Sequence, residues 1–211
     1  MEDFSLAKSI MEVLKHPLSI AALIGLVALI VVLIRIRKIK FDTRLIAQIG
    51  IALTLATVLK IFRIYHLPQG GSITLGSMVP ILLLAFFYGP EVGYLTGFLY
   101  GIITLILDPF ILHPVQVLFD YPLPFIALGV AGYFKDKKIL GTVAAIFMRF
   151  LCHFISGVAF FGSYAPKGMS PVVYSLTLNG VFLAIEGAIC VVIIAMLPMD
   201  RLKNMVLRRS N

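Results

Sequence analysis

The sequence predicts an all-α integral membrane protein with a six-helix core and one added N-terminal transmembrane helix. Composition is the first reason: 60% of the 211 residues are hydrophobic and 13% are charged, whereas soluble domains have about 25% charged residues. Length is the second reason, because several apolar runs approach the roughly 20 residues that a helix needs to cross a bilayer. The runs are continuous rather than alternating, so strands are not expected.

Seven apolar runs are candidate spans, of which the third and fourth are short and rich in glycine. They cover approximately residues 18–36, 45–62, 72–87, 93–107, 115–134, 140–161 and 171–197. The first run, "LSIAALIGLVALIVVLI", contains no ionisable side chain. We therefore expect residues 1–40 to form an anchor helix with a basic connection, and residues 41–211 to form the six-helix membrane domain.

The distribution of basic residues predicts the orientation. Twelve of the 18 Lys and Arg residues lie in three stretches, residues 35–44, 135–138 and 201–209, which alternating spans place on one side. The positive-inside rule assigns that side to the cytoplasm. We expect a protein of the plasma membrane with its N-terminus outside and its C-terminus in the cytoplasm. The net charge of +8 does not indicate nucleic acid, because the cations lie in short connections.

Three polar residues from three spans share one depth in the outer leaflet. At 1.5 Å per residue, Asp120, His153 and Asn179 lie roughly 9, 13 and 12 Å below the outer surface. A membrane histidine often bonds a carbonyl, and an asparagine often joins helices. A carboxylate in hydrocarbon costs about 2.5–3.5 kcal/mol, so Asp120 should face the bundle interior or a cavity.

Two further charges lie near the middle of their spans. We expect Arg149 and Glu186 to form a buried ion pair that clamps the bundle, which leaves Asp120 available. The alternative is that Arg149 pairs with Asp120, and Glu186 then needs another partner.

One stripe of the sixth span carries His153, Gly157 and Phe160 or Phe161 at helical spacing. A glycine between an imidazole and a ring makes room for a flat ligand against the helix. Equally, Gly157 could let a neighbouring helix approach closely.

Five motifs, in order, are similar to those of the thiamine-specific S components of energy-coupling factor (ECF) transporters. They are "GGSITLGSMVPI", "GYLTGFLYG", "ILHPVQVLFDYPLPFIALGVAG", "HFISGVAFFGSYAPKG" and "YSLTLNG", within residues 42–197. The resemblance implies a six-helix membrane protein that captures thiamine from outside with high affinity. It also implies partners: a transmembrane coupling protein and two cytoplasmic ATPases that drive inward release.

The resemblance also implies a binding site. The family's ligand contacts fall on Asp120, Tyr121, His153, Gly157, Phe161, Tyr174 and Asn179. The family has a glutamate at the position of Asp120 and tryptophans at Phe161 and near Gly71, whereas this chain has no tryptophan. We expect the aromatic side chains among these residues to form the walls of the site, because aromatic faces attract the thiazolium cation.

Two more features have a functional and a structural interpretation. The loop with Gly70 and Gly71 is a candidate lid, since glycines give hinge freedom, or it is a simple turn. Small residues of the second span, Gly50 with Thr54 and Ala52 with Ala56, resemble the surface on which the family meets its coupling protein; the alternative is packing within the core.

Other classes remain possible. A secondary carrier would couple transport of a small cationic vitamin to protons or cations at Asp120, His153 or Glu186. A receptor that only senses thiamine is another alternative. An intramembrane enzyme is not expected, because no HExxH, GxSxG or paired aspartates occur. No P-loop occurs either, so we expect no cofactor and no metal in this chain, and ATP hydrolysis in its partners.

Overall fold

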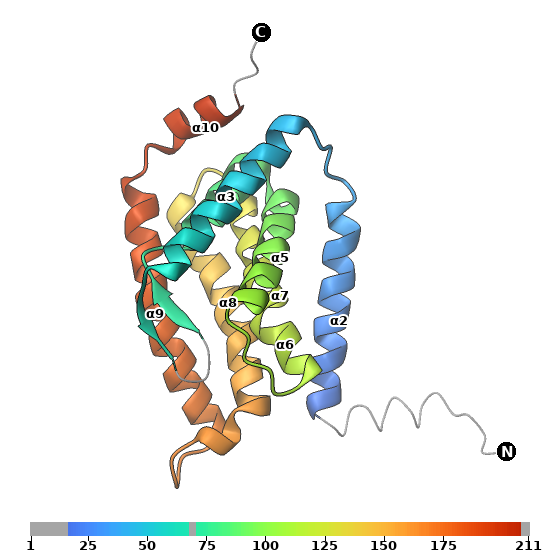
Figure 1. Cartoon of the computed structure of the whole chain (residues 1–211), viewed down its shortest axis with the longest axis vertical. Coiled ribbons are helices and arrows are strands. Elements are labelled where there is room, and N and C mark those ends of the chain that lie inside the picture. The colour runs from blue at the N-terminus through green and yellow to red at the C-terminus, as the bar shows by residue number, and fades with distance from the viewer. Residues whose placement is uncertain (1–16, 68–70, 208–211) are drawn as a thin grey trace, which may run out of the picture.

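The computed structural model describes residues 17–67 and 71–207, where the chain forms a helical bundle with one short hairpin (Figure 1). In chain order the elements are α2 (Pro17–Ile36), α3 (Thr43–Ile61), β1 (Arg63–His66), β2 (Ser72–Thr74), α4 (Val79–Tyr88), α5 (Pro90–Leu107), α6 (Pro114–Asp120), α7 (Pro122–Ile126), the 3-10 helix η1 (Ala127–Tyr133), α8 (Lys138–Phe160), the 3-10 helix η2 (Gly162–Tyr164), α9 (Pro171–Met196) and α10 (Met199–Leu207).

Six helical stretches of the described chain are long and apolar enough to cross a membrane, which confirms the all-α membrane fold class. The prediction of a span over residues 72–87 is wrong, because the helix there, α4, begins only at Val79 and has 10 residues. At about 1.5 Å per residue such a helix is too short for a 30 Å hydrocarbon core. Gly76, with φ of +85°, turns the chain before α4 begins. Eight residues of α4 are buried by neighbouring helices rather than by lipid.

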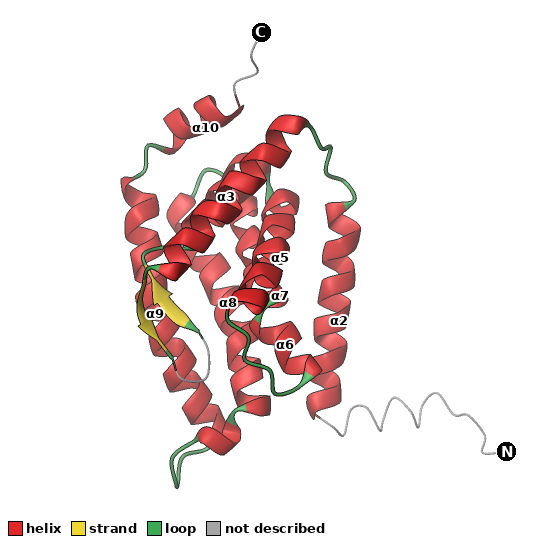
Figure 2. Ribbon diagram, in the orientation of Figure 1, coloured by secondary structure: helices red, strands yellow, loops and turns green. Residues whose placement is uncertain are grey.

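A two-stranded antiparallel hairpin follows α3, so the expectation that the chain has no strands is wrong (Figure 2). Arg63 pairs with Thr74 and His66 pairs with Ser72. Leu67 N donates a hydrogen bond of 3.0 Å to Gly71 O at the end of the ladder. The paired segments have four and three residues, too few for their alternation to stand out among the long apolar runs.

The fifth predicted span is broken into α6, α7 and η1. The break falls at Tyr121, before Pro122, because proline has no N–H and its ring clashes with the preceding helical turn. The backbone there lies directly on α5: a Cβ atom added at Gly101 would be 2.7 Å from Tyr121 O. This close contact sets the position of the break, and with it the positions of Asp120 and Tyr121, relative to α5.

The added helix α2 packs along the bundle rather than standing apart from it. Ala21 and Val32 are buried against the neighbouring helices. In the last turn of α2, Arg35 Nη1 lies 3.7 Å from a carboxylate oxygen of Glu91 in α5.

The described parts of the three basic stretches lie at one end of the molecule. In Figure 1 the connection from α2 to α3, the connection from η1 to α8, and α10 all lie at the top. The opposite end holds the start of α6 and the connection from α8 to α9 (Figure 1). This arrangement agrees with alternating spans, and the assignment of the basic end to the cytoplasm stays a prediction.

Candidate functional site

One cavity brings together all seven residues predicted to bind a ligand. It lies between the hairpin, the end of α5, α6, α8 and α9, towards the end opposite the basic stretches. The predicted residues that line it are Asp120, Tyr121, His153, Gly157, Phe161, Tyr174 and Asn179. They come from three segments that are far apart in the sequence, namely the junction of α6 and α7, the end of α8 and the first part of α9, and the fold brings them around one cavity. Their common depth in the membrane stays a prediction.

Asp120 is the centre of a hydrogen-bonded cluster on the α6 side of the cavity. Its Oδ2 accepts a 2.6 Å hydrogen bond from Gln116 Nε2, and its Oδ1 lies 3.3 Å from His153 Nδ1. Gln116 also donates to Phe110 O (3.0 Å) and accepts from Leu112 N (3.0 Å). The carboxylate is therefore tied to the loop before α6 as well as to α8. His153 Nε2 is buried and has no hydrogen-bond partner within the described ranges, which leaves it available to a ligand.

The contact between α8 and α9 explains Gly157. Asn179 Nδ2 donates to His153 O (3.2 Å) and lies 3.1 Å from Ser175 Oγ, which donates to Phe154 O (2.8 Å). A Cβ atom at Gly157 would lie 2.2 Å from Ser175 Oγ and 2.8 Å from Asn179 Nδ2. The close-approach interpretation of Gly157 is therefore confirmed, although the residue also lines the cavity.

Aromatic side chains form part of the cavity lining. The Tyr121 hydroxyl donates to Asp108 O (2.9 Å) and accepts from Phe110 N (2.6 Å). The Phe161 ring stacks on the Phe110 ring, with centroids 5.8 Å apart and planes at 24°. Tyr174 is half-buried at the start of α9 and lines the same cavity.

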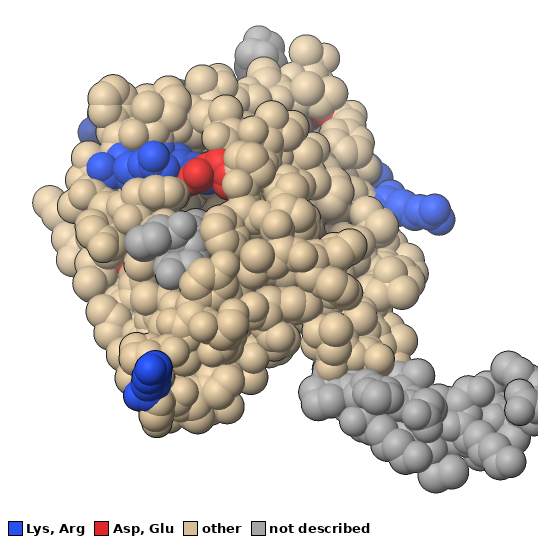
Figure 3. All heavy atoms as spheres, turned by 60° about the horizontal axis from the view of Figure 1, so that its bottom comes forward, with Lys and Arg blue, Asp and Glu red and all other residues tan. Residues whose placement is uncertain are grey.

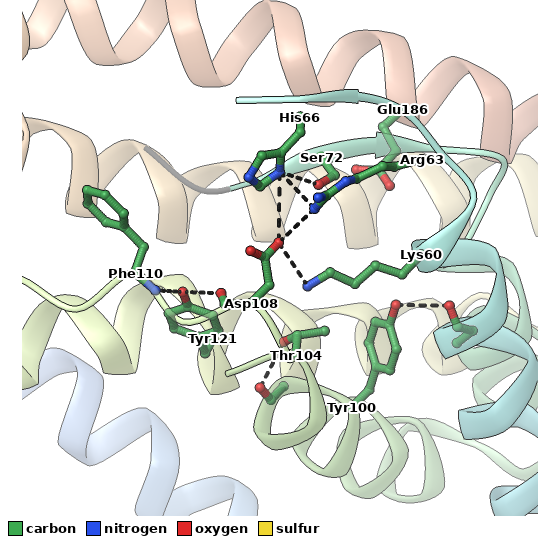
Figure 4. Close-up of polar contacts among 12 residues, drawn as sticks. Lys60, Arg63, His66, Ser72, Tyr100, Thr104, Asp108, Phe110, Tyr121 and Glu186 are labelled. Atoms are coloured by element: carbon green, nitrogen blue, oxygen red, sulfur yellow. Dashed lines mark hydrogen bonds and ion pairs between the residues drawn. The ribbon is translucent and has the colours of Figure 1, made fainter. Parts of the chain in front are cut away.

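A charged cluster joins the hairpin to the end of α5 (Figure 4). Asp108 Oδ2 lies 3.2 Å from Arg63 Nη1, 3.8 Å from His66 Nδ1 and 3.9 Å from Lys60 Nζ. Figure 3 shows a largely uncharged face with one place where basic and acidic atoms adjoin. Asp108 therefore holds cations of α3 and β1 beside the cavity.

The end of the cavity nearer the middle of the bundle contains the predicted ion pair. Arg149 Nη2 lies 3.9 Å from Glu186 Oε2, close enough for charge attraction and too far for a hydrogen bond. The Arg149 guanidinium lies 4.2 Å above the Phe125 ring, and the Thr74 hydroxyl donates to Glu186 Oε1 (2.7 Å). The pairing with Glu186, rather than with Asp120, is the one predicted, and its role as a clamp stays a prediction.

Within residues 17–67 and 71–207, no three His, Cys, Asp or Glu side chains are grouped so that they could hold a metal ion. The polar groups of the cavity are carboxylates, an imidazole, amides, and the Lys60 and Arg149 cations, a mixture that suits an organic ligand.

Comparison with known proteins identifies the family. Residues 46–206 match the family model described as thiamine transporter protein (Thia_YuaJ). The chain belongs to this thiamine transporter family. The match begins after α2, so the added helix lies outside it. Membership makes the chain a multi-pass membrane protein of a transporter family rather than an enzyme.

Two thiamine transporters are clearly related to the chain. The thiamine transporter ThiT of Bacillus subtilis (strain 168) is 38% identical over 150 residues, which are 63% of this chain and 78% of the relative. The thiamine transporter ThiT of Lacticaseibacillus paracasei is 30% identical over 177 residues, 74% of this chain and 84% of the relative. The solved structure of ThiT from Listeria monocytogenes superposes with a TM-score of 0.63 at 22% identity, over 73% of this chain and 94% of that one. This structure supports the fold.

Several cavity residues of this family member are not among those predicted from the sequence to contact the ligand. Asp108 and Gln116 are the main ones, with Lys60 and the Arg149–Glu186 pair. Gln116 had a detectable signal, because it is a polar residue four positions before Asp120 on the same helical face. Asp108 had none, since an aspartate before a proline is an ordinary turn.

The four residues of the predicted docking face of α3 do not lie on one exposed surface. Gly50 and Thr54 are exposed, whereas Ala52 is 7% and Ala56 0% exposed. The Ala56 carbonyl accepts a hydrogen bond from the buried Tyr100 hydroxyl (3.1 Å). Ala52 and Ala56 therefore pack within the bundle, which corrects their assignment to a docking surface.

The candidate lid is described only in part. Gly70 lies outside the described residues. Gly71 has a φ of +86° and lines the cavity. A Cβ atom added at Gly71 would lie 3.4 Å from Leu67 Cδ1. The position of the hairpin over the cavity is compatible with the lid interpretation, which stays a prediction.

Proposed function

We propose that the chain is the thiamine-binding S component of an ECF transporter, which captures thiamine from outside the cell with high affinity. The observation that carries this proposal is the Asp120–His153 contact of 3.3 Å inside a cavity walled by Tyr121, Phe161 and Tyr174. Thiamine combines a permanently cationic thiazolium with a flat aminopyrimidine. Aromatic faces attract such a cation by about 0.5–2 kcal/mol each, and a carboxylate adds a counter-charge or accepts from the amino group.

Delivery into the cell requires an energy source that this chain does not contain. The sequence lacks a P-loop, so ATP would be hydrolysed by two cytoplasmic partner ATPases joined through a transmembrane coupling protein. The exposed Gly50 and Thr54 of α3 remain the candidate contact with that coupling protein. In this proposal the chain needs no cofactor. Its N-terminus lies outside the cell, and its basic end lies in the cytoplasm.

Calorimetric titration of the detergent-purified chain tests the capture step. Thiamine should bind tightly without any partner subunit, pyrithiamine should compete, and riboflavin should not bind. Absence of thiamine binding would overturn the proposal.

Uptake into proteoliposomes tests the coupling. Transport should require the coupling protein and ATPases with ATP inside, and should persist when a protonophore collapses the proton gradient. Uptake by the chain alone, driven by a proton gradient, would instead establish a secondary carrier.

A further inference from the structure

The inner end of the cavity contains polar groups that the predicted ligand contacts do not use. Arg149 and Glu186 line this end, and both are buried, with 5% and 1% of their surface exposed. Thr74 and Phe125 lie beside them. Buried charged groups of this kind normally have complete hydrogen bonding, because an unpaired one costs about 1–3 kcal/mol or more.

Here the hydrogen bonding is incomplete on both partners. Arg149 Nε and Nη1 and Glu186 Oε2 have no hydrogen-bond partner within residues 17–67 and 71–207. The pair itself is separated by 3.9 Å, so it does not satisfy these atoms. Two unpaired N–H donors and one unpaired carboxylate acceptor therefore lie side by side at the cavity wall.

The chemistry of this arrangement selects one kind of ligand group. A hydroxyl donates one hydrogen bond and accepts others, so it can satisfy Glu186 and Arg149 at once. A phosphate would accept from Arg149 but would place negative charge against Glu186. Lys60, the other cation at the cavity, is already 3.9 Å from the Asp108 carboxylate. A ligand ammonium group could donate to Glu186 but would place positive charge against Arg149.

The distance along the helices fits an elongated ligand. Arg149 is four residues from His153 on α8, and Glu186 is seven residues from Asn179 on α9. At 1.5 Å per residue the inner pair lies roughly 6–10 Å beyond the outer polar cluster. A molecule with a ring at Asp120 and His153 can therefore extend a short side chain to the inner pair.

We propose that Arg149 and Glu186 form a subsite for a ligand hydroxyl, and that this subsite discriminates against phosphorylated ligands. The inference rests on the proposed function, under which the hydroxyl is that of the hydroxyethyl side chain of thiamine. Thr74 is a positioning residue, because its hydroxyl donates to Glu186 Oε1, whereas Oε2 has no hydrogen-bond partner among the described residues and is left for the ligand hydroxyl. The pair thus acts in recognition as well as in packing.

The test compares three ligands on the unmodified chain by calorimetric titration. They are thiamine, an analogue with an ethyl group in place of the hydroxyethyl group, and thiamine monophosphate. The analogue and the monophosphate should each bind at least about tenfold more weakly than thiamine, since each leaves a buried group unpaired or repelled. This comparison needs no substitution, so it does not depend on whether a variant folds.

Glu186→Gln gives an independent readout. The amide keeps the size of the side chain, removes the charge and can donate to a phosphate, so the preference for thiamine over its monophosphate should fall about tenfold or more. Glu91→Gln is the matched control, because Glu91 also forms an ion pair, at 3.7 Å from Arg35, but does not line the cavity. The control should keep the preference of the unmodified chain.

The outcomes separate the two proposals. Tight thiamine binding with equal affinity for the ethyl analogue and the monophosphate would overturn the hydroxyl subsite and leave the proposed function standing. A preference that Glu186→Gln leaves unchanged would also overturn it, since the discrimination would then lie elsewhere. No thiamine binding at all would overturn the proposed function and the subsite with it.

Discussion

Asp120 Oδ1 lies 3.3 Å from His153 Nδ1, so the last residue of α6 contacts the C-terminal third of α8 across the cavity. The other carboxylate oxygen is held by Gln116, one turn earlier in α6. The two side chains thus link α6 to α8 and present a carboxyl group and an imidazole to the same cavity.

Replacing Asp120 with asparagine should weaken thiamine binding by roughly tenfold to a hundredfold, because a hydrogen bond to a charged group contributes about 1.5–3 kcal/mol. Calorimetric titration measures the change. Asp136→Asn, at an exposed carboxylate in the connection after η1, is the control and should leave the affinity unchanged. An unaltered affinity in the Asp120 variant would show that thiamine does not bind at this cluster.

Gly157→Ala should destabilise the bundle by about 1–3 kcal/mol, the usual cost of overpacking. The new methyl group would meet Ser175 Oγ at 2.2 Å and push α9 away from α8. Thermal unfolding in detergent measures this effect. Gly180→Ala is the matched control, because its nearest neighbour would be Phe150 Cε2 at an ordinary 3.8 Å. Equal melting temperatures for the two variants would contradict the close packing at Gly157.

The sequence predicts the membrane class and the depth of the polar residues because both follow from local patterns. Continuous apolar runs identify spans, and residue counts from a helix end place Asp120, His153 and Asn179 at one level. The family resemblance adds Tyr121 and the other aromatic positions. Their meeting around one cavity is what the fold contributes.

The errors have physical reasons that local patterns do not contain. The run over residues 72–87 is apolar enough for a span, but Gly76 and a two-stranded pairing with residues 63–66 take up its first part. Ala52 and Gly50 look alike as small residues, and only the position of Tyr100 shows that one side of α3 is core. Asp108 gathers the side chains of a lysine, an arginine and a histidine that are 42 to 48 residues away, and no spacing rule predicts these contacts.

Asp108→Asn should speed the dissociation of thiamine a few-fold, since ion pairs at partly exposed sites contribute about 0–1 kcal/mol each. The carboxylate joins Lys60, Arg63 and His66 to the end of α5, so its loss frees the hairpin beside the cavity. Stopped-flow displacement measures the rate at low and high salt. Salt should accelerate release from the unmodified chain and have less effect on the variant, because screening removes the same attraction. An equal salt dependence of the dissociation rate in the variant and the unmodified chain would contradict the proposal that Asp108 holds the hairpin beside the cavity.

Gly25→Val should weaken both stability and thiamine binding, because α2 packs on the helix that carries Asp120. A Cβ atom at Gly25 would lie 2.8 Å from Phe119 Cε2 and 3.0 Å from Leu118 Cδ2. Phe119 directly precedes Asp120, so a shift of its ring moves the carboxylate. We expect a cost of about 1–3 kcal/mol in detergent unfolding and partial recovery when Phe119→Leu is added. Leu26→Val, on the exposed face of α2, is the control. A Gly25 variant with normal affinity and melting would show that α2 is only an anchor.

Leucine substitutions along α3 should separate docking from packing. Gly50 is exposed and has no heavy atom within 4 Å of an added Cβ, so Gly50→Leu should leave thiamine affinity and melting unchanged and abolish uptake that depends on the coupling protein. Ala56 is fully buried, so Ala56→Leu should instead lower stability by about 1–3 kcal/mol. Titration, thermal unfolding and reconstituted uptake on the same preparations measure the three quantities. Normal uptake by the Gly50 variant would exclude this face of α3 as the contact, because a leucine there cannot fit where a glycine lets two helices approach closely.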